Sequence, residues 1–520
     1  YRQIMKRTVR FLGLFAALLL LQLNAIQTYA SRVDLKTAKH IAALYMSAKT
    51  GEKSLNDANM TLVYEIPNVD LGITALYFFN TSNGGFCVVS GDDCMDPIIA
   101  YSTESVLDAN SMAPAFLWYL NNFAENIRFY QNTKATPAPD VMAMWKEIAA
   151  GNVQADNSKQ IWKTMTSIWN QDYPFNIYSP TVAGQDYWGD PDTIQAPTGC
   201  VATAMSQIIH YWEYPVKPTG TVQYYWRTGD LYLREKLDTV TYNYDLMPDT
   251  AFRRNMYGNY CWWNDAQIRE TSKLNYHCGL ANHMDYDYDG SGALSETYTR
   301  LAFINNFKYD RDSIQAIDRT KYPFVNSSST PKHGDTLWLD TLAREIKAKR
   351  PIFYTGYDLS SSGVHAGHAF NMERYNSSTK MGWFNWGWGG SGDCWCNVIK
   401  SQLTASEYTF QSKHWALIGI QPPADTINPG GNEPALINPV EIQIQVLPAY
   451  PNPAREWVNI PYSLGNETQA VLEIYSIDGR LMERRTVHAG NNQACINVST
   501  YAKGIYVCRI GGVARKFSVE

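Results

Sequence analysis

A glycine and a cysteine stand directly before an apolar helical repeat, and this feature constrains the fold most. The apolar residues after Cys200 recur at helical spacing, at Val201, Met205, Ile208, Ile209 and Trp212. The spacing predicts a buried helix that begins at Cys200. Unpaired backbone N–H groups and the positive end of the helix dipole favour a thiolate at this position. Cys200 is therefore a candidate nucleophile, and the alternative is an inert core cysteine.

A thiolate nucleophile also needs a proton acceptor, for which the sequence offers His368. This histidine begins a strand-like segment, and Asn385 and Trp386 follow on a predicted return strand after a turn near residues 376–378. The order resembles papain, in which an asparagine orients the imidazole and a tryptophan shields that hydrogen bond from water. We therefore interpret His368 as the general base.

Two other histidines need to be weighed against His368. His210 lies ten residues beyond Cys200 on the same predicted helix, roughly 15 Å along its axis, and cannot reach back to the thiol. His365 lies three residues before His368 and is the main alternative.

The combined motifs resemble the streptopain family of secreted cysteine peptidases. The resemblance rests on residues 199–212, 367–370 and 385–390 and extends over most of residues 35–420. It implies a two-lobed papain-like α+β domain over residues 158–423. It also implies that the Gln171 side chain, with the Cys200 N–H, forms the oxyanion hole. Trp388 and Gly367 would line the substrate cleft.

The segment before the peptidase resembles the inhibitory prodomain of the same family. Residues 31–157 are predicted to form an α+β unit, with a helix over 35–48 and a hairpin across 77–89. A small, polar stretch at 151–158 marks its end and offers a site for proteolytic nicking. The resemblance implies that the prodomain displaces the catalytic histidine until it is removed.

The end of the chain has the short alternating runs of a small β-sandwich. Residues 446–520 follow a linker-like segment at 424–445, and the motifs at 450–454, 478–480 and 502–506 resemble a type IX secretion sorting domain of the Bacteroidetes. The resemblance implies secretion machinery as a partner. The alternative is an adhesive or carbohydrate-binding β-module.

The first thirty residues have the order of a secretory signal peptide. Lys6, Arg7 and Arg10 precede an apolar run over 11–23 and a small-residue end at 28–30. The alternative, a membrane anchor, needs a run of about 20 apolar residues. We expect a secreted or cell-surface protein with no stable membrane span.

Charge and cysteine content narrow the partners. The net charge is -5, and no basic field of the kind that binds nucleic acid is present. Nine cysteines in an exported chain suggest disulfides, but an odd number leaves at least one thiol free or paired between chains. We expect Cys200 to be free.

A second motif satisfies the EF-hand calcium-loop pattern. Its carboxylates fall at loop positions one, three, five and twelve, in Asp285, Asp287, Asp289 and Glu296. The segment before the loop is not convincingly helical, and Gly292 replaces the usual apolar anchor. The favoured interpretation is a polar loop at the cleft. No cofactor is expected to be required, with calcium as the alternative.

The sequence therefore predicts a cysteine endopeptidase, made as a zymogen, that acts on protein or peptide substrates and is inhibited by its own prodomain. One alternative is a secreted adhesin or binding protein on a degenerate peptidase scaffold. Another is acyl transfer to an amine, which uses the same Cys–His chemistry.

Overall fold

The computed structural model divides into two compact units, Tyr1–Pro434 and Ala435–Glu520. It describes residues 32–520 apart from 134–135, 157, 186–190, 256–257, 320–332, 359–366, 399–403, 406–407, 410–411, 425, 427–443, 447–448, 450–451, 465–468 and 489–492. The predicted signal peptide and most of the predicted linker lie outside the described residues.

The predicted prodomain segment folds as a four-stranded antiparallel meander flanked by helices. Its elements are α2 (Leu35–Thr50), β1 (Met60–Asn68), β2 (Ile73–Thr81), β3 (Phe86–Ser90), β4 (Ile98–Ser102), α3 (Pro114–Thr133) and α4 (Pro139–Ala149). The Asp34 side chain caps α2 by accepting the Thr37 N–H at 2.7 Å, and Gly51 ends the helix in the left-handed conformation. The predicted hairpin is confirmed by the β2–β3 pairing.

The following segment supplies the other helices and strands of the first unit. Its helices are α5 (Cys200–Trp212), α6 (Asp265–Ala281), α7 (Ser295–Leu301) and α8 (His333–Lys347). Its strands are β5 (Ile161–Lys163), β6 (Thr181–Gln185), β7 (Pro191–Gln195), β8 (Thr221–Trp226), β9 (Leu231–Lys236), β10 (Phe252–Asn255), β11 (Gly258–Cys261), β12 (Gln315–Asp318), β13 (Ile352–Asp358), β14 (Gly367–Asn376), β15 (Met381–Asn385), β16 (Cys394–Asn397), β17 (Thr404–Ala405), β18 (Tyr408–Thr409) and β19 (Ser412–Ile418). The predicted α+β class is confirmed.

One sheet joins the two segments. Its strand order is β1-β2-β3-β4-β16-β15-β14-β13-β19-β12, with β5 paired to β14. The seam is the β4–β16 ladder, in which Tyr101 lies opposite Trp395 and Ala100 lies opposite Cys396. The prodomain is therefore not a separate body, because it extends the sheet that carries the predicted catalytic strand β14.

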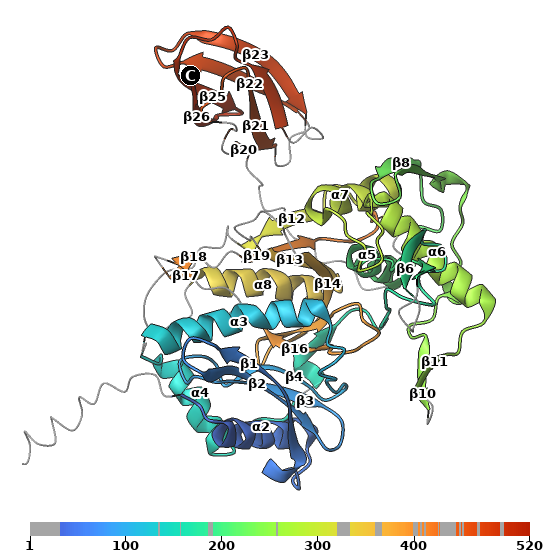
Figure 1. Ribbon diagram of the computed structural model, residues 1–520, viewed down its shortest axis with the longest axis vertical. Coiled ribbons are helices and arrows are strands. Elements are labelled where there is room, and N and C mark those ends of the chain that lie inside the picture. Colours follow the sequence, from blue (N-terminus) through green and yellow to red (C-terminus); the bar gives the residue numbers. More distant parts are fainter. Residues whose placement is uncertain are drawn as a thin grey trace, which may run out of the picture. The chain divides into compact units, whose positions relative to one another are not determined.

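Different helices cover the two faces of this sheet. Helices α3 and α8 lie over one face, as Figure 1 shows, and share a core with Tyr354, Phe370 and Trp386. Helices α5 and α6 pack on the other side, in a core that includes Phe353 and Ala369. Because successive strand residues point to opposite faces, β13, β14 and β19 each contribute to both cores.

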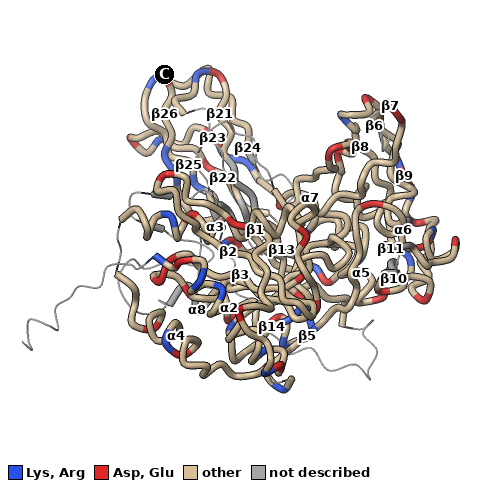
Figure 2. Tube along the Cα trace, turned by 60° about the horizontal axis from the view of Figure 1, so that its bottom comes forward, with Lys and Arg blue, Asp and Glu red and all other residues tan. Residues whose placement is uncertain are grey.

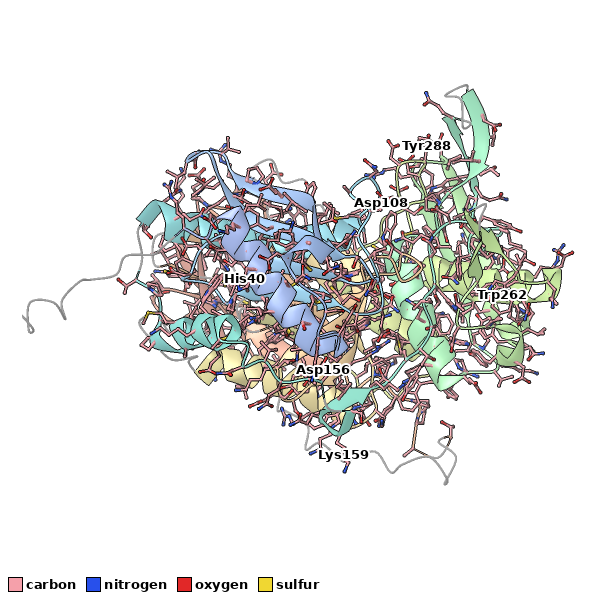
Figure 3. All side chains as sticks on the ribbon, turned by 90° about the horizontal axis from the view of Figure 1, so that it is seen from below. His40, Asp108, Asp156, Lys159, Trp262 and Tyr288 are labelled. Carbon is pink, nitrogen blue, oxygen red and sulfur yellow. The ribbon has the colours of Figure 1, made fainter. Side chains whose placement is uncertain are left out.

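The predicted boundary at residues 151–158 is mostly exposed but anchored at one residue. Asp156, labelled in Figure 3 beside the end of α2, accepts hydrogen bonds from Lys49 Nζ at 2.7 Å and the Tyr101 hydroxyl at 2.8 Å. The Asn376 Nδ2 group of β14 donates a third bond at 3.1 Å. This junction is therefore attached to both segments.

The second unit consists of two antiparallel sheets with one shared core. One sheet contains β20 (Gln445–Val446), β21 (Trp457–Ser463) and β24 (Gln493–Asn497), and the other contains β22 (Gln469–Ser476), β23 (Leu481–His488), β25 (Gly504–Ile510) and β26 (Val513–Val519). Val458 and Ile460 of the first sheet pack with Leu472 and Ile474 of the second. The predicted β-sandwich agrees with this arrangement.

The structure bears on the expectations about disulfides, surface charge and a membrane span. None of the nine cysteines forms a disulfide, although the Cys394 and Cys396 sulfurs lie 3.3 Å apart. Figure 2 shows charged residues of both signs spread over the described elements. None of the described helices combines the length and the apolar character that crossing a bilayer requires.

Candidate active site

Cys200 is the first residue of α5, as the sequence predicts. Gly199 before it has a φ of 85°, a left-handed conformation that favours glycine. A Cβ at position 199 would also lie 2.7 Å from the Met284 sulfur and 2.8 Å from the Ser291 carbonyl oxygen. The Met284 and Ser291 atoms therefore approach the backbone so closely that only glycine fits before the cysteine.

The electrostatic expectation for Cys200 needs correction. Burial raises the pKa of the thiol above its ordinary value of 9.0 and outweighs the backbone hydrogen bonds, from Ala369, Val201 and Cys200 itself, that lower it. The N–H groups of the helix end are present, but the low-dielectric surroundings disfavour the thiolate more strongly. The pKa of the Cys200 thiol therefore lies above, not below, its ordinary value.

A cavity of about 1070 Å³ opens beside Cys200. The Ala369 N–H of β14 donates to Cys200 Sγ at 3.4 Å, so the predicted catalytic strand lies against the thiol. Gly367, His368 and Ala369 line the cavity on this side, and residues of the α6–α7 loop and of β8 line the other side. The structure thus brings Cys200 and the segment of His368 to one site.

The strand register places His368 on the sheet face opposite α5. His368 and His414 both lie opposite Gly356, and directly paired residues point to the same face. That face is occupied by Trp118 of prodomain helix α3, whose ring lies 5.2 Å from His414 between centroids. A Cβ on Gly356 would lie 1.9 Å from the Trp118 ring. The prodomain therefore fills the surface from which the His368 side chain projects.

Asn385, which the resemblance to papain predicts to orient His368, is fully buried and forms hydrogen bonds with other groups. Its Nδ2 group donates to the Ser167 carbonyl at 2.7 Å, Gln207 Oε1 at 3.1 Å and Glu373 Oε2 at 3.2 Å. Its Oδ1 atom accepts the Gly387 N–H at 3.0 Å. Asn385 thus ties the loop after β15 to α5 and β14.

Gln207 is a residue that sequence reasoning missed. It lies on α5 two turns beyond Cys200, is fully buried, and accepts the Trp169 N–H at 3.1 Å as well as the Asn385 amide. The sequence signal for Gln207 was its polar amide within a helix of mostly apolar residues. A buried amide is stable only when it is hydrogen-bonded.

The two tryptophans after Asn385 occupy different surroundings. Trp386 is fully buried, and its ring lies 5.6 Å from Phe116 and 5.8 Å from Tyr119 of α3 between centroids. Trp388 is partly buried against the same core and does not line the cavity. Trp386 therefore packs on the prodomain side of the sheet.

Gln171 lies close to the start of α5 through its backbone. Its carbonyl accepts the Thr198 N–H at 2.8 Å, two residues before Cys200. The side chain is partly buried and does not line the cavity. The structure thus brings the Gln171 segment to the nucleophile.

The loop that matches the EF-hand pattern forms part of the cavity lining, in agreement with the favoured interpretation of a polar loop at the cleft. Asp285 is engaged by Arg227 Nη2 at 2.7 Å and the Thr228 N–H at 3.1 Å. No three carboxylates of this loop bring their oxygens within 4.8 Å of one another, the spacing that a shared metal ion would need. In the described chain, that spacing is met by the side chains of Asp92, Asp93 and Cys94. Helix α7 begins at Ser295, inside the predicted loop.

A second histidine, which sequence reasoning did not select, also lines the cavity. His283 stacks on Tyr224 with centroids 4.8 Å apart and contacts Tyr298 at 4.3 Å. Burial lowers the pKa of its imidazole. His365, the alternative to His368, lies outside the described residues.

Three family models match the chain in succession. The Spi protease inhibitor model matches residues 30–127, the peptidase C10 family model matches residues 169–396, and the secretion system C-terminal sorting domain model matches residues 448–519. The resemblances inferred for the prodomain, the peptidase and the tail are thereby confirmed.

Relatives match across more than one segment. The chain is 26% identical to thiol protease/hemagglutinin PrtT of Porphyromonas gingivalis, over 80% of this chain and 44% of that protein. It is 25% identical to streptopain of Streptococcus pyogenes, over 69% of this chain and 83% of streptopain. A prointerpain A fragment of Prevotella intermedia superposes with a TM-score of 0.50 at 23% identity, covering 69% of this chain and 98% of the fragment, which supports the fold.

Proposed function

Since the chain carries a peptidase C10 domain behind an inhibitor-type prodomain, we propose that Cys200 and His368 are the nucleophile and general base of its cysteine endopeptidase activity. The observation that supports this most directly is the contact at 3.4 Å between the Ala369 N–H and Cys200 Sγ. It brings the residue after His368 against the thiol, at a cavity with room for a peptide.

The proposed reaction follows from the chemistry of these two side chains. His368 takes the thiol proton, and the thiolate attacks the peptide carbonyl carbon. The C–N bond breaks as the imidazolium gives its proton to the leaving amine, which leaves an acyl-enzyme. Water, deprotonated by His368, then hydrolyses the thioester and restores Cys200.

The oxyanion of each tetrahedral intermediate needs donors, and we assign the Cys200 N–H and the Gln171 side chain. The hydrogen bond from Thr198 to the Gln171 carbonyl supports this assignment, because it fixes the Gln171 segment beside the N-terminus of α5. Asn385 acts through Gln207 as a positioning residue for the loop that carries Trp386. No metal or cofactor enters these steps.

Latency follows from the same packing. Trp118 of the prodomain covers the sheet face that His368 shares with Gly356 and His414, while burial raises the pKa of the Cys200 thiol. Productive geometry therefore requires removal of α3, which exposes the face that carries His368. The mostly exposed segment at 151–158 is our proposed cleavage region.

Export is the third part of the proposal. The sorting-domain match at 448–519 supports secretion or attachment at the cell surface, with the secretion machinery as the partner of the second unit. Proteins or peptides outside the cell are then the substrates.

The test compares the secreted chain with its Cys200→Ala variant after limited proteolysis. We expect casein cleavage to fall at least about a thousandfold, as for nucleophile removal in other peptidases. An epoxide that alkylates thiols should label Cys200, as located by peptide mass mapping. Cys495→Ala, which removes an exposed cysteine of the second unit, serves as the control and should keep both properties.

Cleavage that survives in Cys200→Ala would refute the proposal. Binding to casein without cleavage would favour the adhesin alternative. Incorporation of an amine in place of hydrolysis would favour acyl transfer.

A further inference from the structure

The cavity at Cys200 has one wall for which the catalytic steps provide no role. Residues of the α6–α7 loop, the start of α7 and strand β8 line the cavity together with Gly367 and Ala369. We call Asp285, Asp287 and Glu296, which come from the loop and the start of α7, the acidic wall. Arg227 supplies the one guanidinium among the lining residues that the structure describes.

Arg227 pairs with one of the three carboxylates of this wall. Arg227 engages Asp285 at 2.7 Å, and the Thr228 N–H binds the other oxygen of the same carboxylate. Asp287 and Glu296 are exposed at the cavity, and partial burial lowers the pKa of the His283 imidazole. The lining residues that the structure describes therefore include three carboxylates and one guanidinium.

Aromatic rings complete the wall. Tyr224, Tyr225 and Tyr298 line the same cavity, and the Tyr225 side chain is about half exposed. The face of a tyrosine ring attracts a cationic group, and its edge packs along an aliphatic stem. A cavity lined by both carboxylates and tyrosine rings is therefore suited to a long side chain that ends in a positive charge.

We propose that the acidic wall selects substrates with a lysine or arginine side chain close to the scissile bond. The inference rests on the proposed function, because the wall is defined relative to the Cys200 nucleophile. A cation held near Asp287 and Glu296 gains Coulomb energy in a partly desolvated cleft, whereas a glutamate at the same position is repelled.

The test uses the proteolytically activated chain and fluorogenic peptides that differ at one position between P3 and P2′, where lysine, glutamine or glutamate is placed. We expect kcat/KM for lysine to exceed that for glutamine by about tenfold at one position at least, with glutamate lowest. In 0.5 M salt the ratio should shrink to about twofold, because the charges are screened.

Variants assign the preference to the wall. Asp287→Asn combined with Glu296→Gln should bring the lysine-to-glutamine ratio close to one. Asp238→Asn, which neutralises an exposed carboxylate outside the cavity lining, is the matched control and should keep the ratio. Rescue by Asp287→Glu would confirm that charge, not shape, determines the preference.

Two failures can be told apart. Equal or faster cleavage of glutamine or glutamate peptides at all positions would overturn the acidic-wall inference, while Cys200-dependent cleavage would leave the proposed function intact. Cleavage that persists in Cys200→Ala, or no cleavage of any peptide, would overturn the proposed function and the inference with it.

Discussion

The two faces of strand β14 pack against different helices, α5 on one face and α3 on the other. On one face Ala369 and Asn371 pack on α5, where Asn371 Nδ2 donates to the Ala204 carbonyl at 3.0 Å. On the other face Phe370 and the position of His368 lie under prodomain helix α3. The nucleophile belongs to the first face and its proposed base to the second. The comparison teaches that one strand can contact the nucleophile through Ala369 and carry the proposed base at the preceding position, while the prodomain covers only the face of the base.

The sharpest test of this comparison uses the two histidines that lie opposite Gly356. We expect His368→Asn to lower kcat/KM of the activated enzyme at least about a thousandfold, because no general base remains. His414→Asn removes a buried ring bonded to the Tyr354 hydroxyl at 2.7 Å, so it should lower stability while cleavage persists. Peptide hydrolysis at pH 7 measures both. Activity retained in His368→Asn and lost in His283→Ala would move the base to the cavity wall.

Trp118 tests what the prodomain covers. Trp118→Ala should lower the free energy of unfolding of the full chain by about 3–5 kcal/mol and speed its activation, because a large buried ring is lost from the sheet face. Urea unfolding in a Cys200→Ala background gives the first quantity, and casein cleavage in the active chain gives the second.

Trp145→Ala is the control for this variant, since Trp145 belongs to prodomain helix α4 and packs in a different core. It should destabilise the prodomain without an equal gain in activity. Equal activation by both variants would argue against a specific role of Trp118.

The two faces should also respond oppositely to pH. Burial raises the pKa of Glu373, on the α5 side, from 4.5 to about 7, and burial lowers the pKa of His414 from 6.5 to about 3. Glu373 therefore contributes stability that is lost as pH rises from about 4.5 to 7. His414 contributes stability that is lost as pH falls below about 6.5.

These shifts correspond to about 3 kcal/mol for Glu373 and about 5 kcal/mol for His414. Urea unfolding of the Cys200→Ala chain between pH 3 and 8, alone and with Glu373→Gln or His414→Gln, measures them. We expect Glu373→Gln to flatten the alkaline side of the curve and His414→Gln the acid side. A variant that flattens the opposite side would show that the assignment of the two groups is wrong.

A smaller effect is expected at Gly356. A Cβ there meets the Trp118 ring at 1.9 Å, so Gly356→Ala should destabilise the full chain by about 1–3 kcal/mol. In the Trp118→Ala background the same substitution should cost much less, and a double-mutant cycle of unfolding free energies measures the coupling. Additive effects would mean that the ring is not held against the strand.

The smallest expected effect concerns calcium. The loop carboxylates do not converge in the structure, and Asp285 is already paired with Arg227. We therefore expect millimolar calcium to leave the melting temperature within about 1 °C of that in chelator, where ligand linkage would raise it. A larger increase, lost in Asp289→Asn, would restore the EF-hand interpretation.

Local patterns predicted much of the fold. The apolar spacing after Cys200 gave the start of α5, and the turn near residues 376–378 gave the β14–β15 hairpin. These elements form from neighbours in sequence, so periodicity is enough to find them. The β4–β16 seam could not be predicted, since it pairs residues almost three hundred positions apart with no local signal for their register.

The candidate site divides in the same way. The sequence by itself determined which groups are available: a cysteine at a helix start, a histidine at a strand start and an acidic loop. Only the tertiary structure decided their state. Burial raises the Cys200 pKa where the helix end was expected to lower it, Gln207 accepts a hydrogen bond from Asn385, and Trp118 covers the sheet face of His368. The burial of a side chain and the groups that pack against it depend on segments that are distant in sequence, so no local pattern predicts them.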